Sequence, residues 1–220
     1  MQQLEIEFST WGGRRDGAGR KRKPRGNVPH RPRERHRHSH PVHVTMRARR
    51  GLPPLREQAL FRELRTRIAE ANRSPKLREA FRIVHFSVQN DHLHMIVEAH
   101  DRSALSRGVQ GLAIRLARRV NRLLGVRGRF WSDRFHSREL ASPRAVRNAI
   151  VYVLMNAKKH GARIAGIDPL SSAPWFEGFL QSGPTADGDP PVRPPRTWLG
   201  GVGWRRHGLV RLEERPRAPG

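Results

Sequence analysis

Apolar residues recur with two different periods between residues 40 and 160, and the order of these periods restricts the fold more than any other feature. Alternation at every second position predicts strands over residues 40–47, 82–89 and 92–99, with a shorter one over residues 134–140. The turn pair at residues 90–91 predicts that the second and third strands form a hairpin. The predicted apolar face of the second strand consists of Val84, Phe86 and Val88.

Spacings of three and four residues predict three helices between and after these strands. The first has an apolar stripe from Leu60 to Ile68, and the second begins at Ser103 as its N-cap and stops at Gly125. The third opens with Ser142-Pro143 and runs to residue 160. The stripe of the second helix consists of Leu105, Val109, Leu112, Leu116, Val120 and Leu123.

The resulting order is strand, helix, strand, strand, helix, strand, helix. Its first six elements follow the order β-α-β-β-α-β, which is the ferredoxin-like arrangement. We therefore predict an α+β domain over residues 39–165, with an antiparallel sheet and one additional helix on a side of that sheet.

Two flanking segments differ from this domain in composition. Residues 1–38 read as a basic flexible arm that lacks the apolar residues to fold alone. Its basic run loosely resembles an AT-hook, although a solvated tail with non-specific phosphate affinity is the simpler interpretation; the run consists of Arg20, Lys21, Arg22, Lys23 and Arg25. Prolines and glycines in residues 166–220 predict an extension that is partly packed, then extended or disordered. Its aromatic residues are candidates for packing or, at Trp198 and Trp204, for stacking on bases.

Charge and cysteine content narrow the function classes. Lys and Arg total 44 against 19 Asp and Glu, a formal net charge of +25, which favours polyanions as partners. With no cysteine, disulfides, thiolate zinc sites and a cysteine nucleophile are excluded. No apolar run could span a bilayer and no signal peptide is evident, so we expect no membrane partner and a cytoplasmic, nucleoid-associated protein.

The first candidate site is His92-Leu93-His94 in the third predicted strand. Alternate side chains of a strand share a face, so both imidazoles point the same way while Leu93 points into the core. Two neutral imidazoles on one face suit a divalent metal, which would need a further ligand from elsewhere. Two ordinary surface histidines are the competing interpretation.

The second candidate site combines Tyr152, the only tyrosine, with Asn156. Four residues apart on a helix, they are neighbours on one surface, about 120° from the centre of the apolar stripe at about 100° per residue. Lys159 falls on the same surface. This set suits a nucleophile, a metal ligand and a phosphate contact; the competing interpretation is a boundary tyrosine with its hydroxyl in water.

These residues resemble the HUH endonucleases, above all their single-tyrosine transposases and the REP-associated tyrosine transposases among them. The family carries a helical motif Tyr-Ile-x-x-Asn-Pro-Val-Lys-His-Gly, and residues 152–161 match its Tyr, Asn, Lys, His and Gly. Ala157-Lys158 replaces the family's Pro-Val. Residues 90–96 and 129–135 resemble the segments around the histidine pair and before the last strand.

The resemblance implies cleavage and rejoining of single-stranded or hairpin DNA through a 5′-phosphotyrosine link on Tyr152, in transposition or REP-element mobilisation. It implies that His92, His94 and Asn156 hold Mg²⁺ or Mn²⁺. Relatives act as monomers or as homodimers. The DNA backbone would be held by Lys159, Arg115, Arg118, Arg119, Arg122 and Arg134. Two alternatives stay open: a replication-initiator or relaxase-type nickase, and a non-catalytic, domesticated nucleic-acid-binding protein.

Overall fold

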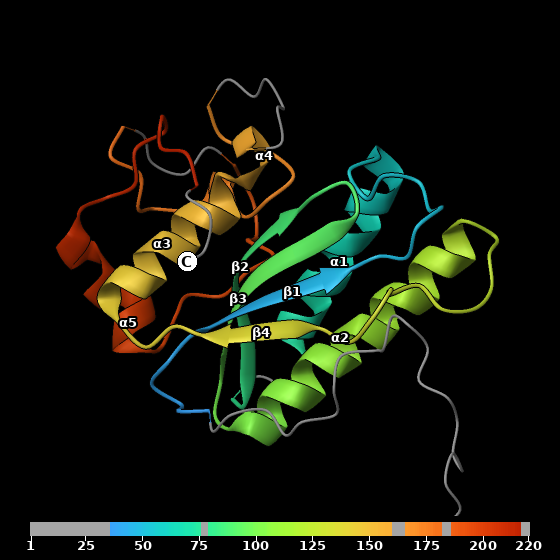
Figure 1. Ribbon diagram of the computed structural model, residues 1–220, viewed down its shortest axis with the longest axis horizontal. Helices are drawn as coiled ribbons and strands as arrows, with labels where there is room; N and C mark the ends of the chain where they lie inside the picture. The colour runs from blue at the N-terminus through green and yellow to red at the C-terminus, as the bar shows by residue number, and fades with distance from the viewer. Residues whose placement is uncertain (1–35, 76–78, 160–165, 182–185, 217–220) are drawn as a thin grey trace, which may run out of the picture. The chain divides into compact units, whose positions relative to one another are not determined.

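Four antiparallel strands form the central sheet of the protein, seen in a computed structural model that describes residues 36–75, 79–159, 166–181 and 186–216 (Figure 1). The strands are β1 (Val42–Arg47), β2 (Phe81–Val88), β3 (His92–Ala99) and β4 (His136–Glu139). They lie in the order β2-β3-β1-β4. β2 and β3 pair as the predicted hairpin, and β1 lies between β3 and β4. This is the strand order of the ferredoxin-like arrangement, which confirms the predicted fold.

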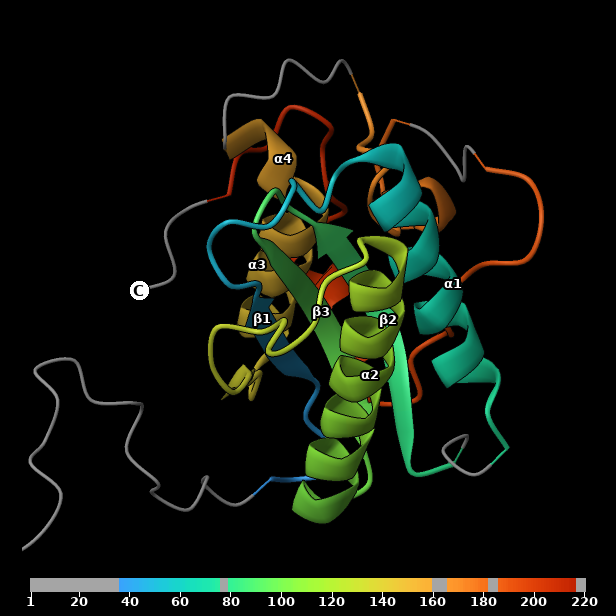
Figure 2. The same cartoon turned by 90° about the vertical axis from the view of Figure 1, so that its right-hand side faces the viewer.

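The helices form layers on both faces of this sheet (Figure 1 and Figure 2). α1 (Gln58–Arg73) and α2 (Arg102–Leu123) cover one face and enclose the larger apolar core. α3 (Pro143–Leu154) packs on the opposite face over a second core. β2 and β3 are buried on both faces, so a polar side chain of β3 that points toward α3 is enclosed between the sheet and the helix.

Strand alternation decides which side chains reach which layer. Leu93, Met95 and Val97 of β3 belong to the core under α1 and α2. His92 and His94 consequently share the opposite face, as the sequence predicts, and the structure places this face toward α3.

A bulge in β2 changes the predicted face of one residue. Ile83 pairs with Val97 and His85 with Ile96, so Val84 is the additional residue. Ile83, and not Val84, therefore joins Phe86 in the core under α1 and α2. The strict two-residue period of the prediction fails here because the ladder takes in one additional residue.

Helix ends also differ from the prediction at three places. Asp101, not Ser103, caps α2 by accepting a hydrogen bond from the Ala104 amide. Leu123, assigned to the apolar stripe, is 48% exposed because it lies in the last turn, where α2 ends. The single helix predicted over residues 142–160 is interrupted at Met155 (φ −103°, ψ 8°), and α4 (Asn156–Lys159) follows.

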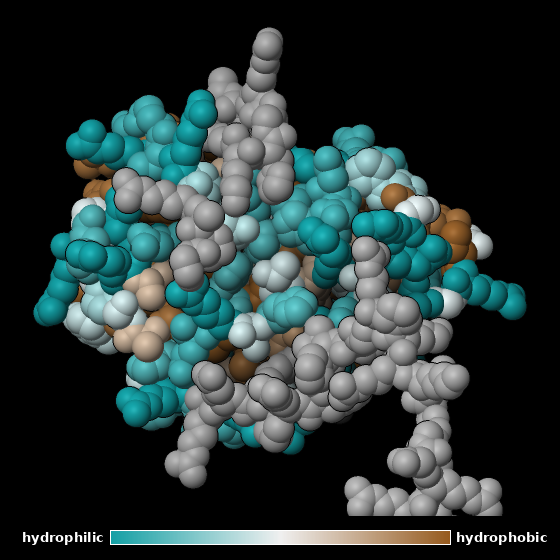
Figure 3. Space-filling view, viewed as in Figure 1, coloured by the Kyte–Doolittle hydropathy of each residue, from teal (hydrophilic) through white to brown (hydrophobic). Residues whose placement is uncertain are grey.

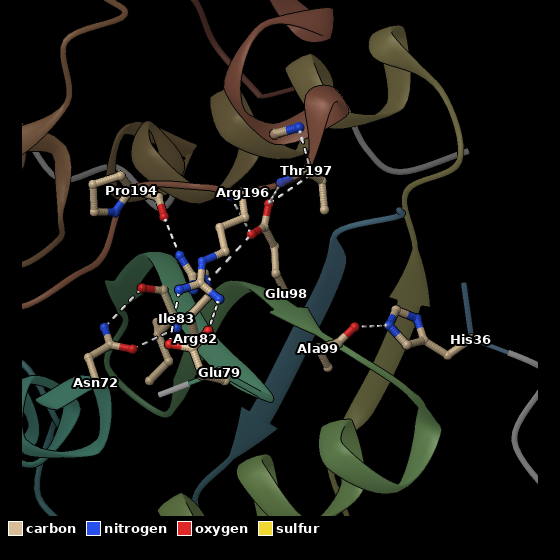
Figure 4. Close-up of polar contacts among 11 residues, drawn as sticks. His36, Asn72, Glu79, Arg82, Ile83, Glu98, Ala99, Pro194, Arg196 and Thr197 are labelled. Atoms are coloured by element: carbon tan, nitrogen blue, oxygen red, sulfur yellow. Dashed lines mark hydrogen bonds and ion pairs between the residues drawn. The ribbon is translucent and has the colours of Figure 1, made fainter. Parts of the chain in front are cut away.

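The C-terminal extension packs on the sheet more fully than its prolines indicate. Leu170 and Ser172 form backbone hydrogen bonds with the outer edge of β2. Further on, the buried Glu98 of β3 accepts hydrogen bonds from Arg196 and Thr197 (Figure 4). These contacts satisfy backbone groups that a solvated tail would leave to water. The short helices in the extension are η1 (Ala173–Trp175), α5 (Trp198–Gly201) and η2 (Gly203–His207).

Phe176, Phe179 and Trp204 of this extension are buried in the core beneath α3, as packing of its aromatic residues predicts. Trp198 is 49% exposed, with the Arg206 guanidinium 4.8 Å from its ring centroid. Hydrophilic residues make up most of the surface on the side shown in Figure 3. Within the described residues, no helix is both long and apolar enough to cross a membrane.

Candidate active site

His94 and Tyr152 meet between β3 and α3. Their ring centroids lie 5.1 Å apart and the rings are nearly perpendicular, at 81°. The His92 ring is 4.5 Å from the His94 ring, again edge to face. Two motifs far apart in the sequence, one on a strand and one on a helix, are thus in contact.

Hydrogen bonds at Nδ1 fix the orientation of both histidine rings. His94 Nδ1 lies 3.1 Å from Thr45 Oγ1 and 3.2 Å from His43 Nε2. His92 Nδ1 bonds to the Asp91 carboxylate. Histidines that ligate metals are commonly held in this way, with one nitrogen bonded to a protein oxygen and the other toward the ion.

His43 is a member of the site that sequence reasoning missed. It lies on β1, next to β3, and its ring is 5.6 Å from that of Tyr152. Burial, aided by the charge of Arg138, lowers the pKa of His43 to about 4, so the ring is neutral at pH 7. The alternation of residues 40–47 places His43 on the polar face of its strand. That His43 lies near His94 depends on the strand order of the sheet.

Asn156 is fully buried one residue beyond the interruption of the helix. Neither its amide oxygen nor its amide nitrogen has a hydrogen-bond partner among the described residues. A buried amide without partners costs about 1–3 kcal/mol, so its presence needs a reason. Groups of three or more His, Cys, Asp or Glu side chains able to hold a metal do not occur in the described part of the chain.

The predicted DNA-binding arginines are not gathered at Tyr152. Arg115, Arg118, Arg119 and Arg122 are on α2, and the sheet lies between α2 and α3. The Arg119 guanidinium is held by Glu63, at 3.1 Å. Arg134 is exposed two residues before β4. Outside the described residues lie the side chain of Lys159 and the whole basic run of Arg20, Lys21, Arg22, Lys23 and Arg25.

Comparison with known proteins agrees with this fold and these motifs. The profile of the family described as "Transposase IS200 like" matches residues 38–153, more than half of the chain. A solved structure described as the REP-associated tyrosine transposase bound to a REP hairpin has the same fold, with a TM-score of 0.53 and 17% sequence identity. The alignment covers 76% of this chain and 98% of that one. No curated protein sequence matches significantly.

The fold and the paired motifs define an α+β protein in which a strand-borne histidine pair faces a helix-borne tyrosine. The chain belongs to the IS200-like transposase family.

Proposed function

We propose that this protein cleaves and rejoins single-stranded DNA, with Tyr152 as the covalent nucleophile, in transposition or REP-element mobilisation. The observation that carries the proposal is the contact of the Tyr152 ring with His94, which joins the two motifs in one place. The solved relative of the same fold is described as bound to a REP hairpin, which supports hairpin DNA as the substrate.

The covalent step is a transesterification. The Tyr152 hydroxyl oxygen forms a bond to phosphorus, the bond from phosphorus to the 3′ oxygen breaks, and the phenolic proton is lost as the 3′ oxygen gains one. The products are a 5′-phosphotyrosine link and a free 3′-hydroxyl. Because one phosphodiester replaces another, the reverse attack by a 3′-hydroxyl rejoins the strand without an added energy source.

A divalent ion fits the residues around Tyr152. Asn156 offers a buried amide without hydrogen-bond partners among the described residues, and each histidine is oriented through Nδ1. His92, His94 and Asn156 would hold Mg²⁺ or Mn²⁺, with the histidines binding through Nε2. Such an ion polarises the scissile phosphate and stabilises charge on the leaving oxygen. Thr45 and Asp91 act as positioning residues for the two rings.

Tyr152→Phe tests the nucleophile. The substitution keeps the ring that packs against His94 but removes the only phenolic oxygen in the chain. We expect DNA binding to persist and the free energy of unfolding to change by less than about 1 kcal/mol. The covalent adduct with a labelled hairpin oligonucleotide in Mn²⁺, measured on a denaturing gel, should disappear.

His92→Ala is the companion variant, because it keeps the nucleophile. We expect adduct formation to slow by orders of magnitude, while the adduct that does form is still on Tyr152. If Tyr152→Phe nicks DNA at the wild-type rate, the nucleophile is water or another hydroxyl, and the transposase chemistry is wrong.

A further inference from the structure

A cleft of about 470 Å³ adjoins Tyr152 on the α3 side of the sheet. We call it the α3 cleft. β4 contributes Arg138, α3 contributes Arg144, Asn148 and Tyr152, and the C-terminal extension contributes residues 207 and 214–215. Its volume is typical of pockets that enclose a small molecule, which suits one or two nucleotides of a single strand.

One face of α3 leads along this cleft to the tyrosine. Arg144, Asn148 and Tyr152 follow one another at intervals of four residues, so their side chains share that face. Arg144 and Asn148 are exposed. A strand lying in the cleft would therefore contact Arg144 and Asn148 on its way to the Tyr152 hydroxyl.

The charge of the cleft is positive, with four guanidinium groups against one carboxylate among the described residues that line it. Neither Arg144 nor Arg215 has an ion pair within the described residues, and both are exposed. Arg138 adds a third guanidinium, and His207 also lines the cleft. Exposed guanidinium groups that line a cleft favour the phosphates of a nucleic acid backbone as ligands.

Glu214 is the one acid among the described residues that line the cleft, and it is already engaged. Arg147 donates two hydrogen bonds to the Glu214 carboxylate, at 2.7 and 3.0 Å, and further ones to the carbonyl oxygens of Gly208 and Leu209. Burial would raise the pKa of Glu214, but the hydrogen bonds from Arg147 and from the Arg211 amide outweigh it and lower that pKa. The hydrogen bonds of Arg147 therefore hold the segment that carries Arg215 against α3.

This segment lies outside residues 38–153, which match the family, yet it forms a wall beside the tyrosine. Its position is set by burial of Trp204 and Val210 in the core beneath α3. This wall of the cleft is therefore anchored by the hydrophobic core of the protein.

We propose that the α3 cleft binds the DNA strand next to the scissile phosphate, and that the C-terminal extension supplies one wall of this binding site through Arg215. Arg144 of α3 contacts the same stretch of backbone. The inference rests on the proposed cleavage of single-stranded DNA, and it specifies the part of the surface on which that strand lies.

The first test compares two charge reversals in the full chain with Tyr152→Phe as background, so that binding is measured without cleavage. Arg144→Glu with Arg215→Glu changes the cleft; Arg62→Glu with Arg65→Glu makes the same charge change on exposed positions of α1, across the sheet. The probe is a fluorescein-labelled oligothymidylate. We expect the cleft pair to weaken binding at least about tenfold and to reduce the log-log salt slope by about 1.4, for two phosphate contacts. An equal loss in both pairs, or none in the cleft pair, overturns the proposal.

The second test uses the absence of cysteine from the chain. Asn148→Cys places one thiol in the cleft, and Arg65→Cys places one on α1; both positions are exposed. After labelling with a thiol-reactive benzophenone, illumination should crosslink the oligonucleotide to position 148 and not to position 65. Equal crosslinking at the two positions overturns the proposal.

The two proposals fail in different ways. Crosslinking at position 148 in a protein whose Tyr152 forms no adduct supports the cleft and contradicts the nucleophile. An adduct on Tyr152 without crosslinking at position 148 supports the nucleophile and contradicts the cleft.

Discussion

Asn156 is the residue whose burial is hardest to explain by packing. Its amide is enclosed and has no hydrogen-bond partner among the described residues, so the folded chain bears a desolvation cost that a ligand would offset. An apolar side chain of similar size would avoid this cost. Stability and metal binding should therefore respond to substitution here in opposite directions.

We expect Asn156→Leu to raise the free energy of unfolding of the metal-free protein by about 1 kcal/mol, because a buried unpartnered amide is removed. The same variant should lose Mn²⁺ affinity at least about tenfold by calorimetry, since the oxygen ligand is gone. Asn156→Asp, which keeps an oxygen, is the matched control and should retain binding. Unchanged Mn²⁺ affinity in Asn156→Leu would exclude this residue as a ligand.

His85 is a second buried residue with a consequence that can be measured. It is on β2, its ring lies 5.3 Å from Phe176, and burial lowers its pKa from 6.5 to about 4. The unfolded chain therefore takes up a proton at His85 at higher pH than the folded chain does. Proton uptake at His85 in the unfolded chain therefore leaves the stability of the fold unchanged above about pH 6.5 and lowers it as pH falls toward 4.

We expect the free energy of unfolding, from urea titrations, to fall between about pH 6.5 and 4.5 with a contribution from His85 of up to about 1.4 kcal/mol per pH unit. His85→Gln should lower stability at about pH 7 but flatten this slope, because glutamine does not titrate. The same slope in wild type and variant would mean that folding does not lower the pKa of His85.

At the scale of elements, α3 is the part that connects the site with the C-terminal extension. One of its faces carries Tyr152 and Arg144, and Arg147 joins the helix to the segment around Gly208 and Glu214. Arg147 is thus a structural residue of α3. Composition alone does not separate it from Arg144, three residues earlier.

Arg147→Ala should lower the free energy of unfolding by about 1–3 kcal/mol, since it removes four hydrogen bonds and leaves the partly buried Glu214 without a guanidinium partner. Hydrogen exchange should also speed up at the Val210 amide, which bonds to the Gly178 carbonyl. Arg144→Ala is the control and should change stability by less than about 0.5 kcal/mol. Equal effects of the two substitutions would contradict the assigned role of Arg147.

At the scale of the whole molecule, the net charge of +25 governs encounter with DNA. Residues 1–38 contribute +7 of this charge, from eleven Lys or Arg against four Asp or Glu. The first described contacts of the chain are those of His36 with the Ala99 carbonyl and of Arg37 with Glu139. A truncation that leaves the sheet intact should therefore end before His36.

We expect deletion of residues 1–32 to weaken binding to all single-stranded sequences and to reduce the salt slope by about 0.7 for each phosphate that this segment neutralises in the full chain. Adduct formation at saturating DNA should stay unchanged, because the residues around Tyr152 remain. A truncated protein with the full-length salt slope would show that this segment makes no DNA contact.

The order of elements, the shared face of His92 and His94, and the helical placement of Tyr152 followed from the sequence. These properties are local: alternation on a strand and spacing on a helix depend on residues a few positions apart. The resemblance to single-tyrosine transposases, carried by the same local motifs, was also apparent and is confirmed by the family match.

The neighbours of these residues were decided only by the tertiary structure. His43 reaches His94 because β1 lies beside β3, and Val84 changes its role because the ladder takes in one additional residue. The α2 arginines are on the far side of the sheet, whereas Arg215 joins the cleft because the core beneath α3 buries Trp204. Contacts over long sequence separations depend on how layers pack, and no periodicity within a single segment records that packing.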